Sequence, residues 1–210
     1  MCGRRTDKME TSYFFEVKRQ LVHLLVGVCI AFGVHILEPL VGKLIVLPLM
    51  LSVVVMLILP KIGEEFRVHN HLLVHFERPR DIQNLPYRGA IFYCLGITPA
   101  ILLLDINTAC AIIAILSMGD STSTMIGKKF GRHRIGHKSL EGSAAFIFFS
   151  FFGALFFLPD DPIKAAVFAL LGGLVELSNV QHDHILVDDN LLVPMVLTLA
   201  AVLTQAPSFM

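Results

Sequence analysis

Seven apolar stretches separated by short polar segments constrain the fold of this chain more than any other feature. They cover residues 20–38, 43–60, 89–104, 106–119, 142–158, 162–180 and 190–206. Several are close to about 17 residues, the lower limit for a helix that crosses the hydrocarbon core of a bilayer. We therefore expect an all-α integral membrane protein with about seven transmembrane helices, the fourth of which continues helically through Thr124.

The composition agrees with this class of protein. Hydrophobic residues make up 55% of the chain and charged residues only 16%, whereas a soluble domain needs more polar residues on its surface. The polar start contains no apolar core followed by a small-residue cleavage site, so we expect no removable signal peptide. The four cysteines show no paired spacing typical of a zinc site or a disulfide framework. The absence of a long charged tail argues against nucleic acid as a partner.

The lysines and arginines predict the orientation in the membrane. Five precede residue 20, five lie in 61–88 and five in 120–141, which leaves only Lys43 and Lys164 elsewhere. Cytoplasmic segments of membrane proteins hold an excess of these residues. We therefore expect a cytoplasmic N-terminus and an outer C-terminus.

This topology makes residues 1–210 a single polytopic membrane domain. Its cytoplasmic segments would meet at one surface and form a nucleotide site, because nucleotides are cytoplasmic. These segments are residues 1–19, 61–88, 120–141 and 181–189.

The polar stretch from Gly119 to Ser143 contains the clearest chemical pattern. If its start is helical, one face presents Ser117, Asp120, Ser121, Thr124 and Lys128. Basic residues then alternate with glycines, which let backbone amides approach a ligand closely. They are Lys128, Lys129, Arg132, Arg134 and Lys138, among Gly127, Gly131 and Gly136. This combination predicts a site for a polyphosphate with its metal.

Acidic residues near the C-terminus complete the candidate site. Glu176 lies in or near the sixth apolar stretch, where an acid is expected to face a protein interior or an aqueous cavity. It shares a helix face with Asn179 and Asp183. Asp188 and Asp189 precede the last apolar stretch. They can either cap that helix or hold Mg²⁺, a cation that prefers oxygen ligands.

Two further polar segments each allow a structural and a functional interpretation. At the start of the first apolar stretch, Arg19 can pair with Glu16 as an interfacial anchor, while the two interpretations are evenly balanced for His23. In the 61–88 loop the basic candidates for phosphate or anionic headgroups are Arg78, Arg80 and Arg88. The histidines at positions 69, 71 and 75 are interpreted as solvated, because no further ligand completes a metal set.

The chemistry that fits these groups is phosphoryl transfer. It requires magnesium, cationic groups on the phosphates and a carboxylate that orients the accepting hydroxyl. Asp120 with Asp188 or Asp189 would hold the metal, and Glu176 would accept the hydroxyl proton. The phosphates would contact Lys128, Lys129, Arg132 and Lys138. The chain lacks a P-loop, a dinucleotide fingerprint and the usual hydrolase motifs.

Taken together, these motifs resemble those of the CTP-dependent lipid kinases, which include dolichol, phytol and farnesol kinases and a CTP-dependent diacylglycerol kinase. The resemblance extends from Glu16…Arg19…His23 to the last apolar stretch. Its specific part is Gly119-Asp120, Gly127-Lys-Lys-Phe-Gly131, Lys138-Ser-Leu-Glu-Gly-Ser143, Glu176 and Asp188-Asp-Asn-Leu-Leu-Val-Pro194. A departure is the Ser-Thr-Ser-Thr run after Asp120, where small apolar residues are expected.

The resemblance implies transfer of the CTP γ-phosphate to a membrane lipid alcohol of the dolichol or polyprenol type, with Mg²⁺ as cofactor. The implied catalytic residues are Glu176, Asp120 and Lys138. The implied nucleotide-binding residues are Gly127, Lys128, Lys129, Gly131, Arg132, Lys138, Ser139, Glu141 and Gly142. The shortness of the chain favours a prokaryotic cell membrane, or the endoplasmic reticulum membrane in a eukaryote, with the active site facing the cytoplasm. The oligomeric state is left open.

Two alternatives remain at this point. The pattern is also similar to that of phosphatidate cytidylyltransferases, which make a CDP-lipid. Those enzymes usually have Pro-Lys-Lys-Thr before the Glu-Gly pair, where this chain has His137-Lys-Ser-Leu, so the kinase is preferred. A small ion-coupled transporter that uses Glu176 and Asp120 is the alternative from another class. It would need repeated halves, and the sequence shows no convincing internal repeat.

Overall fold

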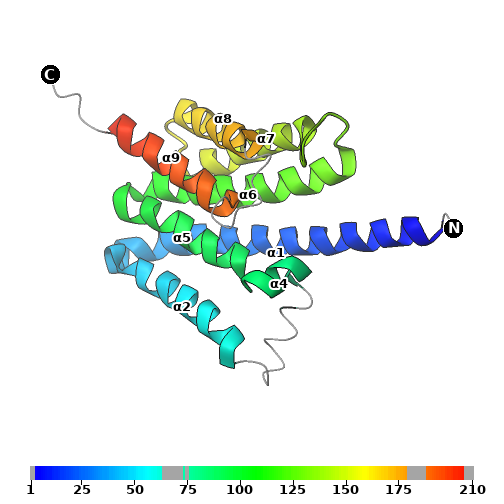
Figure 1. The fold of residues 1–210 in the computed structure, drawn as a ribbon. Helices are drawn as coiled ribbons and strands as arrows, with labels where there is room; N and C mark the ends of the chain where they lie inside the picture. Colours follow the sequence, from blue (N-terminus) through cyan, green and yellow to red (C-terminus); the bar gives the residue numbers. More distant parts are fainter. Residues whose placement is uncertain (1–2, 63–72, 74–75, 179–187, 206–210) are drawn as a thin grey trace.

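A computed structural model describes residues 3–62, 73, 76–178 and 188–205. The described chain is almost entirely helical (Figure 1). Its helices are α1 (Gly3–Val41), the 3₁₀ turn η1 (Gly42–Ile45), α2 (Val46–Ile62), α4 (Pro79–Asn84), α5 (Arg88–Leu103), α6 (Ile106–Phe130), α7 (Leu140–Phe157), α8 (Pro162–Ser178) and α9 (Asp189–Gln205). Two short antiparallel strands, β1 (Arg134–Ile135) and β2 (Lys138–Ser139), join α6 to α7. The all-α prediction is confirmed.

Each of the seven apolar stretches forms a helix, but two helices are longer than their apolar parts. α1 begins at Gly3 rather than at residue 20, and α6 continues beyond Thr124 to Phe130. In both cases the added segment is rich in polar residues. The side chain of Asp105 accepts a hydrogen bond from the Thr108 amide at the start of α6, which is a typical helix N-cap.

The chain is a membrane protein. Three described spans are long and apolar enough to cross a bilayer: Tyr13–Ile62, which includes α1, η1 and α2, then Ile106–Phe130 and Leu140–Phe157. Helices α5 and α9 are apolar but shorter. Large hydrophobic side chains are exposed along these elements, for example Leu25 at 63% and Phe152 at 51%. The count of seven crossings and the orientation of the termini stay predictions.

Helix α6 lies at the centre and packs against α1, α5, α7, α8 and α9. Its Ile112, Ile113, Ile115 and Leu116 side chains are fully buried. Small residues let the neighbouring helices approach closely, as is common where helices pack in membranes. A side chain at Gly172 would meet Phe146 at 3.1 Å and Ile115 at 3.3 Å. Gly172 therefore allows α8 to lie close to α6 and α7.

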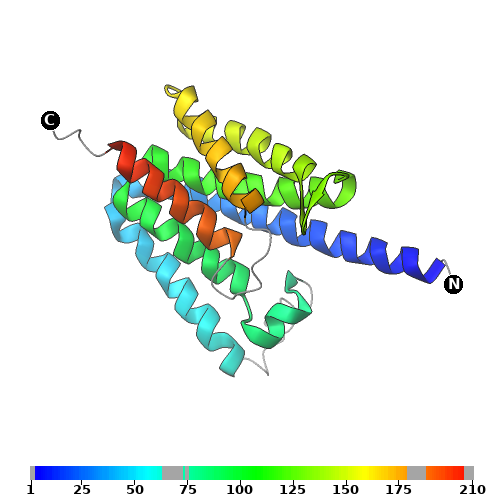
Figure 2. The same ribbon diagram turned by 45° about the horizontal axis from the view of Figure 1, so that its top comes forward.

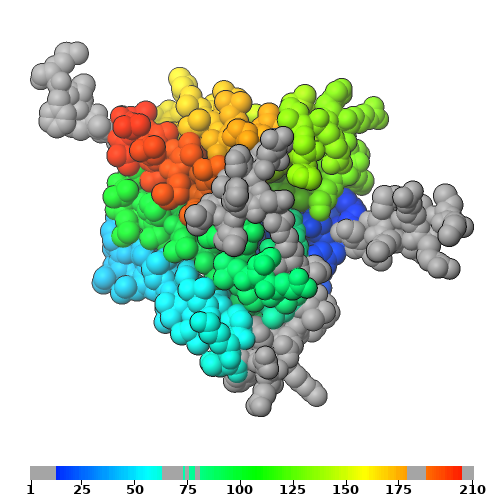
Figure 3. All heavy atoms as spheres, in the orientation of Figure 1, coloured from blue at the N-terminus to red at the C-terminus, as the bar shows by residue number. Residues whose placement is uncertain are grey.

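The remaining helices form a layer beside this centre. α5 lies against α9 on one side and α2 on the other, and the space-filling view shows α9, α5 and α2 in that order down one face (Figure 3). α2 turns back at η1 and diverges from α1 (Figure 2). It packs on α5 through Val53, Ile91 and Cys94.

The basic residues sort to one end of the bundle. Lys43 and Lys164, predicted to lie apart from the rest, are held at the opposite end: Lys43 Nζ lies 3.0 Å from the Leu104 carbonyl oxygen, and Lys164 Nζ lies 2.7 Å from Thr108 Oγ1. Described parts of all four predicted cytoplasmic segments meet instead around one cavity at the other end. Which side of the membrane this end faces stays a prediction.

Candidate active site

A cavity of about 1020 Å³ contains most of the residues that the sequence indicated. Walls from α1, α2, α5, α6, α8 and α9, together with the β1–β2 turn, enclose it. Predicted site residues that line it are Asp120, Gly127, Lys128, Lys138, Ser139, Gly142, Glu176, Asp188 and Asp189. The lining residues that are described do not include Lys129, Gly131, Arg132 or Glu141.

The first charged group in the cavity, called here the acidic cluster, consists of Asp120, Glu176, Asp188 and Asp189. Lys138, from β2, bridges two of these acids. Its Nζ lies 2.7 Å from Glu176 Oε1 and 2.5 Å from Asp189 Oδ2. Burial lowers the pKa of Lys138, but the carboxylates of Asp189, Glu176 and Asp120 more than offset this and raise the pKa above its ordinary value. Lys138 is therefore a fixed cation.

Glu176 is held by hydroxyl groups as well as by Lys138. Its side chain is 3% exposed. Ser143 Oγ donates to Glu176 Oε2 over 2.9 Å, and Ser123 Oγ donates to Oε1 over 3.4 Å. Hydrogen bonds of this kind satisfy an otherwise costly buried carboxylate. The arrangement makes Glu176 well placed to orient Lys138.

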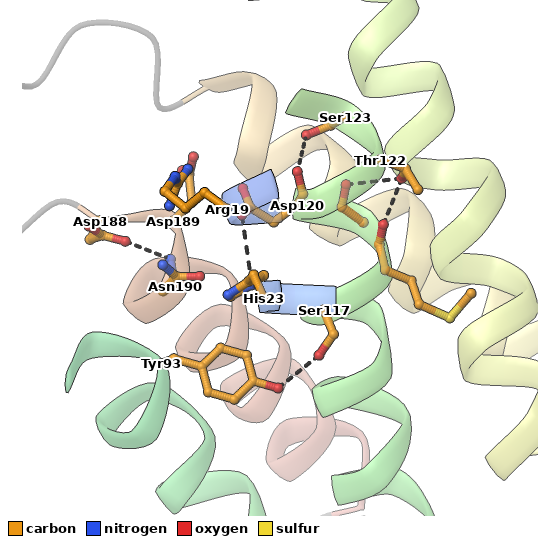
Figure 4. A network of polar contacts seen from close by, with 12 residues as sticks. Arg19, His23, Tyr93, Ser117, Asp120, Thr122, Ser123, Asp188, Asp189 and Asn190 are labelled. Atoms are coloured by element: carbon orange, nitrogen blue, oxygen red, sulfur yellow. Dashed lines mark hydrogen bonds and ion pairs between the residues drawn. The ribbon is translucent and has the colours of Figure 1, made fainter. Parts of the chain in front are cut away.

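Asp188 has both a structural and an electrostatic role. Its Oδ1 accepts a 3.0 Å hydrogen bond from the Asn190 amide at the start of α9 (Figure 4), so the predicted helix cap is present. Its Oδ2 lies 3.3 Å from Arg88 Nε. Burial raises the pKa of Asp188, and Asp120 and Asp189 raise it further, although the Asn190 amide and Arg88 oppose the shift. The carboxylates of Asp120 and Asp189 are thus close enough to Asp188 to disfavour its charged form.

Asp120 lies opposite His23 of α1, and its side chain is 13% exposed. Its Oδ2 lies 3.8 Å from His23 Nε2, which is beyond hydrogen-bond distance. The His23 ring packs edge-on against Tyr93, whose hydroxyl lies 2.8 Å from Ser117 Oγ (Figure 4). His23 therefore belongs to the cavity wall, which favours its functional interpretation over the interfacial one.

Several buried polar atoms in the same wall make no hydrogen bond within the described part of the chain. They include Gln20 Oε1, His23 Nε2 and Asn190 Oδ1, and all three residues line the cavity. A buried polar group without a partner is costly. These atoms are therefore candidate contacts for a ligand.

The second charged group, called here the basic cluster, consists of Arg19, Arg78 and Lys128 arranged around Glu16. The Glu16 carboxylate is 2.6 Å from Arg19 Nη2, 2.5 Å from Arg78 Nη2 and 3.1 Å from Lys128 Nζ. The predicted Glu16–Arg19 pair is present, but it is part of a larger group. All three cations line the cavity.

The glycines of the central stretch mainly allow neighbouring segments of the chain to pack closely, rather than exposing backbone amides to a ligand. A Cβ atom at Gly127 would lie 3.0 Å from Ser139 Oγ, and one at Gly142 would lie 2.9 Å from the Ser123 carbonyl oxygen. Ser139 Oγ accepts a hydrogen bond from the Gly142 amide and so caps α7. Gly136 has a φ of 59°, which suits the turn between β1 and β2.

The predicted residues outside the cavity have other contacts. Glu141 accepts hydrogen bonds from the His133 amide, at 3.1 Å, and lies 2.8 Å from His133 Nδ1. Lys129 lies over the Phe130 ring. Positions 69, 71 and 75, Asn179, Asp183 and residues 181–187 lie outside the described residues, as does the side chain of Arg80.

Sequence reasoning did not single out other groups that line the cavity. They are Glu77, His137 and Ser123, together with Arg134, noted only as part of the basic run, and Asn190, noted only within the motif that begins at Asp188. The position of Asn190 directly after two acids was the one available signal. Burial raises the pKa of Glu77 to about 7, and nearby Asp81 adds to the shift while Arg19 and Arg78 oppose it.

The acidic cluster is compatible with magnesium only if substrate phosphates and water supply the remaining ligands. Among the described residues, no three His, Cys, Asp or Glu side chains are arranged to hold a metal by themselves. Mg²⁺, however, usually takes one or two carboxylates and completes its shell with water and substrate phosphates. Asp120, Asp188 and Asp189 provide such oxygen atoms in one cavity, and a cation would offset the repulsion that the other two exert on Asp188.

Fold and site together define a helical membrane protein with a charged cavity at one end, and comparison with known proteins narrows this class. The chain is 28% identical over 191 residues to an uncharacterized protein of Methanocaldococcus jannaschii. This alignment covers 86% of this chain and 90% of that protein. It is 33% identical over 143 residues to the dolichol kinase of Saccharomyces cerevisiae, over 65% of this chain. The aligned part spans only 26% of that dolichol kinase. No protein-family model and no solved structure matches the chain significantly.

Proposed function

We propose that this protein is a lipid kinase that transfers the γ-phosphate of CTP to the hydroxyl group of a membrane lipid alcohol of the dolichol or polyprenol type. The similarity to a dolichol kinase supports the lipid kinase class. The observation that supports the reaction best is the cavity itself, which brings a basic cluster and an acidic cluster together in a membrane protein. Phosphoryl transfer depends mainly on positioning and on charge stabilisation by groups of these two kinds.

In this proposal the basic cluster binds the donor. Arg78 and Lys128 are 48% and 42% exposed, so they can exchange part of their contact with Glu16 for phosphate oxygens. Arg and Lys are the usual phosphate-binding side chains. Lys138, the cation shared by two carboxylates of the acidic cluster, stays charged and would stabilise negative charge on the transferred phosphoryl group.

The acidic cluster would handle the acceptor and the metal. Asp120 is the best-placed group to accept the hydroxyl proton, because its Oδ2 lies beyond hydrogen-bond distance from His23. Glu176, the base expected from the sequence, is engaged by Lys138, Ser143 and Ser123 and would instead hold Lys138 in place. Asp188 or Asp189 would hold Mg²⁺ together with the nucleotide phosphates. The cation would reduce the negative charge of those phosphates.

The test is an incubation of the purified protein with magnesium, mixed lipid alcohols and CTP labelled in either the α- or the γ-phosphate. γ-Label in the extracted lipid, with CDP released, supports the kinase, and the mobility of the product identifies the alcohol. α-Label in lipid would instead indicate a cytidylyltransferase. If neither label moves and ATP and phosphatidate controls are also silent, the kinase proposal is wrong and the ion-coupled transporter becomes the better hypothesis.

A further inference from the structure

The cavity has an uncharged end, called here the apolar arm, which the reaction itself does not use. It is lined by Val22, Val26 and Ile30 of α1 and by Pro48, Leu49 and Met56 of α2. The α1 residues are spaced by four, and Leu49 and Met56 are spaced by seven, so each set lies on one face of its helix. The arm adjoins His23, which follows Val22 on the same helix.

The apolar arm is open at its side. Val22 and Val26 line the cavity, and yet they are 37% and 51% exposed. The reason is the path of α2, which packs on α5 and diverges from α1 beyond η1 (Figures 1 and 2). The outer faces on either side are apolar, with Leu25 and Leu51 both 63% exposed. An opening with such margins in a membrane protein faces lipid.

The length of the arm indicates what kind of molecule fits. Val22 and Ile30 are eight residues apart, or about 12 Å along a helix. The hydrocarbon core of a bilayer is about 30 Å thick. A hydrocarbon chain of membrane length therefore cannot be enclosed in the arm, and it can leave only through the open side between α1 and α2.

We propose that the gap between α1 and α2 is the lateral entrance through which the acceptor lipid reaches the active site. The hydroxyl group lies near Asp120 and His23, the first part of the chain lies along Val22, Val26 and Met56, and the rest stays in the bilayer. This inference rests on the proposed function for the identity of the acceptor. It also predicts that chain length beyond the arm has little influence on the reaction, whereas the shape of the chain near the hydroxyl group matters.

Photolabelling tests the entrance without relying on activity. The probe is a long-chain primary alcohol with a diazirine in mid-chain, added to the full-length protein in phosphatidylcholine vesicles. Adducts are expected on α1 and α2, around Val26 and Met56. Adducts confined to the exposed faces of α7 and α8 would overturn the proposal. If adducts form at the entrance but CTP transfers no phosphate to any alcohol, the proposed function fails and the entrance stands. If phosphate is transferred but the adducts form elsewhere, the proposed function stands and the entrance is wrong.

Substitutions provide the second test. Val26→Trp and, independently, Met56→Trp narrow the arm, and each is expected to reduce labelling and phosphorylation of the long-chain alcohol about tenfold or more. Ile36→Trp, on the same helix and 62% exposed, is the matched control. Unchanged labelling in both folded variants would contradict the entrance.

Discussion

The two charged clusters share one cavity but are built in opposite ways. In the acidic cluster one cation, Lys138, is shared by two carboxylates, and these groups are 21% exposed or less. In the basic cluster one carboxylate, Glu16, is shared by three cations, two of which are more than 40% exposed. The first arrangement is enclosed and fixed, and the second is open to solvent. A fixed group suits the reacting atoms, whereas an open cationic group suits a phosphate chain that must enter and leave.

The largest expected effect follows from Asp120→Asn, because it removes the acid nearest to the proposed acceptor hydroxyl. We expect turnover to fall by about 10³-fold, the range seen when a preorganised catalytic group is lost, while the protein stays folded in detergent. The measurement is the steady-state rate with γ-labelled CTP. Asp160→Asn, at the exposed α7–α8 connection, is the control. Full turnover in the Asp120 variant would remove this residue from both the metal and the proton assignment.

The second expected effect is on stability and separates the enclosed cluster from the open one. Lys138→Met leaves the carboxylates of Glu176 and Asp189 without their common cation, and breaking such a buried pair costs about 3–5 kcal/mol. Thermal unfolding in detergent measures the loss. The double variant Lys138→Met/Glu176→Gln should recover part of it, since one of the unpaired charges is then removed. A Lys138→Met protein as stable as the wild type would show that the acidic cluster is not electrostatically fixed.

A smaller and different effect is expected in the basic cluster. Arg78→Ala should raise KM for CTP about tenfold, or ~1.4 kcal/mol, with little change in KM for the alcohol. Stability should fall by no more than about 1 kcal/mol, because Arg78 is half exposed and Glu16 keeps Arg19 and Lys128. Lys61→Ala serves as a control outside the cavity. A larger effect of Arg132→Ala than of Arg78→Ala would favour the sequence-based assignment over the cavity.

The smallest expected effect concerns the pH dependence of stability near the basic cluster. The pKa of Glu77 in the folded protein is about 7, above its ordinary value of 4.5, so the folded state binds more protons between these pH values. Stability should therefore fall slightly as pH rises from 4.5 to 7. Glu77→Gln mimics the protonated form and should remove this contribution. Identical pH profiles of denaturant unfolding for both proteins would contradict the shift.

The sequence predicted the helices well, because long apolar stretches allow few other structures in a membrane. It predicted the polar continuation of α6 only as far as Thr124, and it did not predict that α1 begins at Gly3, because polar segments carry no apolar signal. Within the basic run, composition also could not separate Lys128 from Lys129. Consecutive residues on a helix point about 100° apart, and only the packing of α6 decides which of the two faces the cavity.

The candidate site was predictable in part for a similar reason. Asp120 and Lys128 share a helix face that local spacing reveals, and the structure places both in the cavity. Two of the three partners of Glu16, Arg78 and Lys128, could not be found in this way. Arg78 is 62 residues away along the chain, and such a contact depends on how α1 packs against the rest of the molecule.

Helix α1 is a single rod from Gly3 to Val41, about 58 Å long at 1.5 Å per residue. Its cavity face carries Arg19, which lines the proposed donor site, and Val26, which lines the apolar arm. Gly27 leaves no room for a side chain beside Ser117 and Tyr93, so the rod cannot slide past α6 without repacking both helices. A tilt of α1 on nucleotide binding would therefore also move the wall of the proposed lipid entrance. By thermodynamic reciprocity, donor and acceptor would then change each other's affinity by the same factor, which paired titrations can measure.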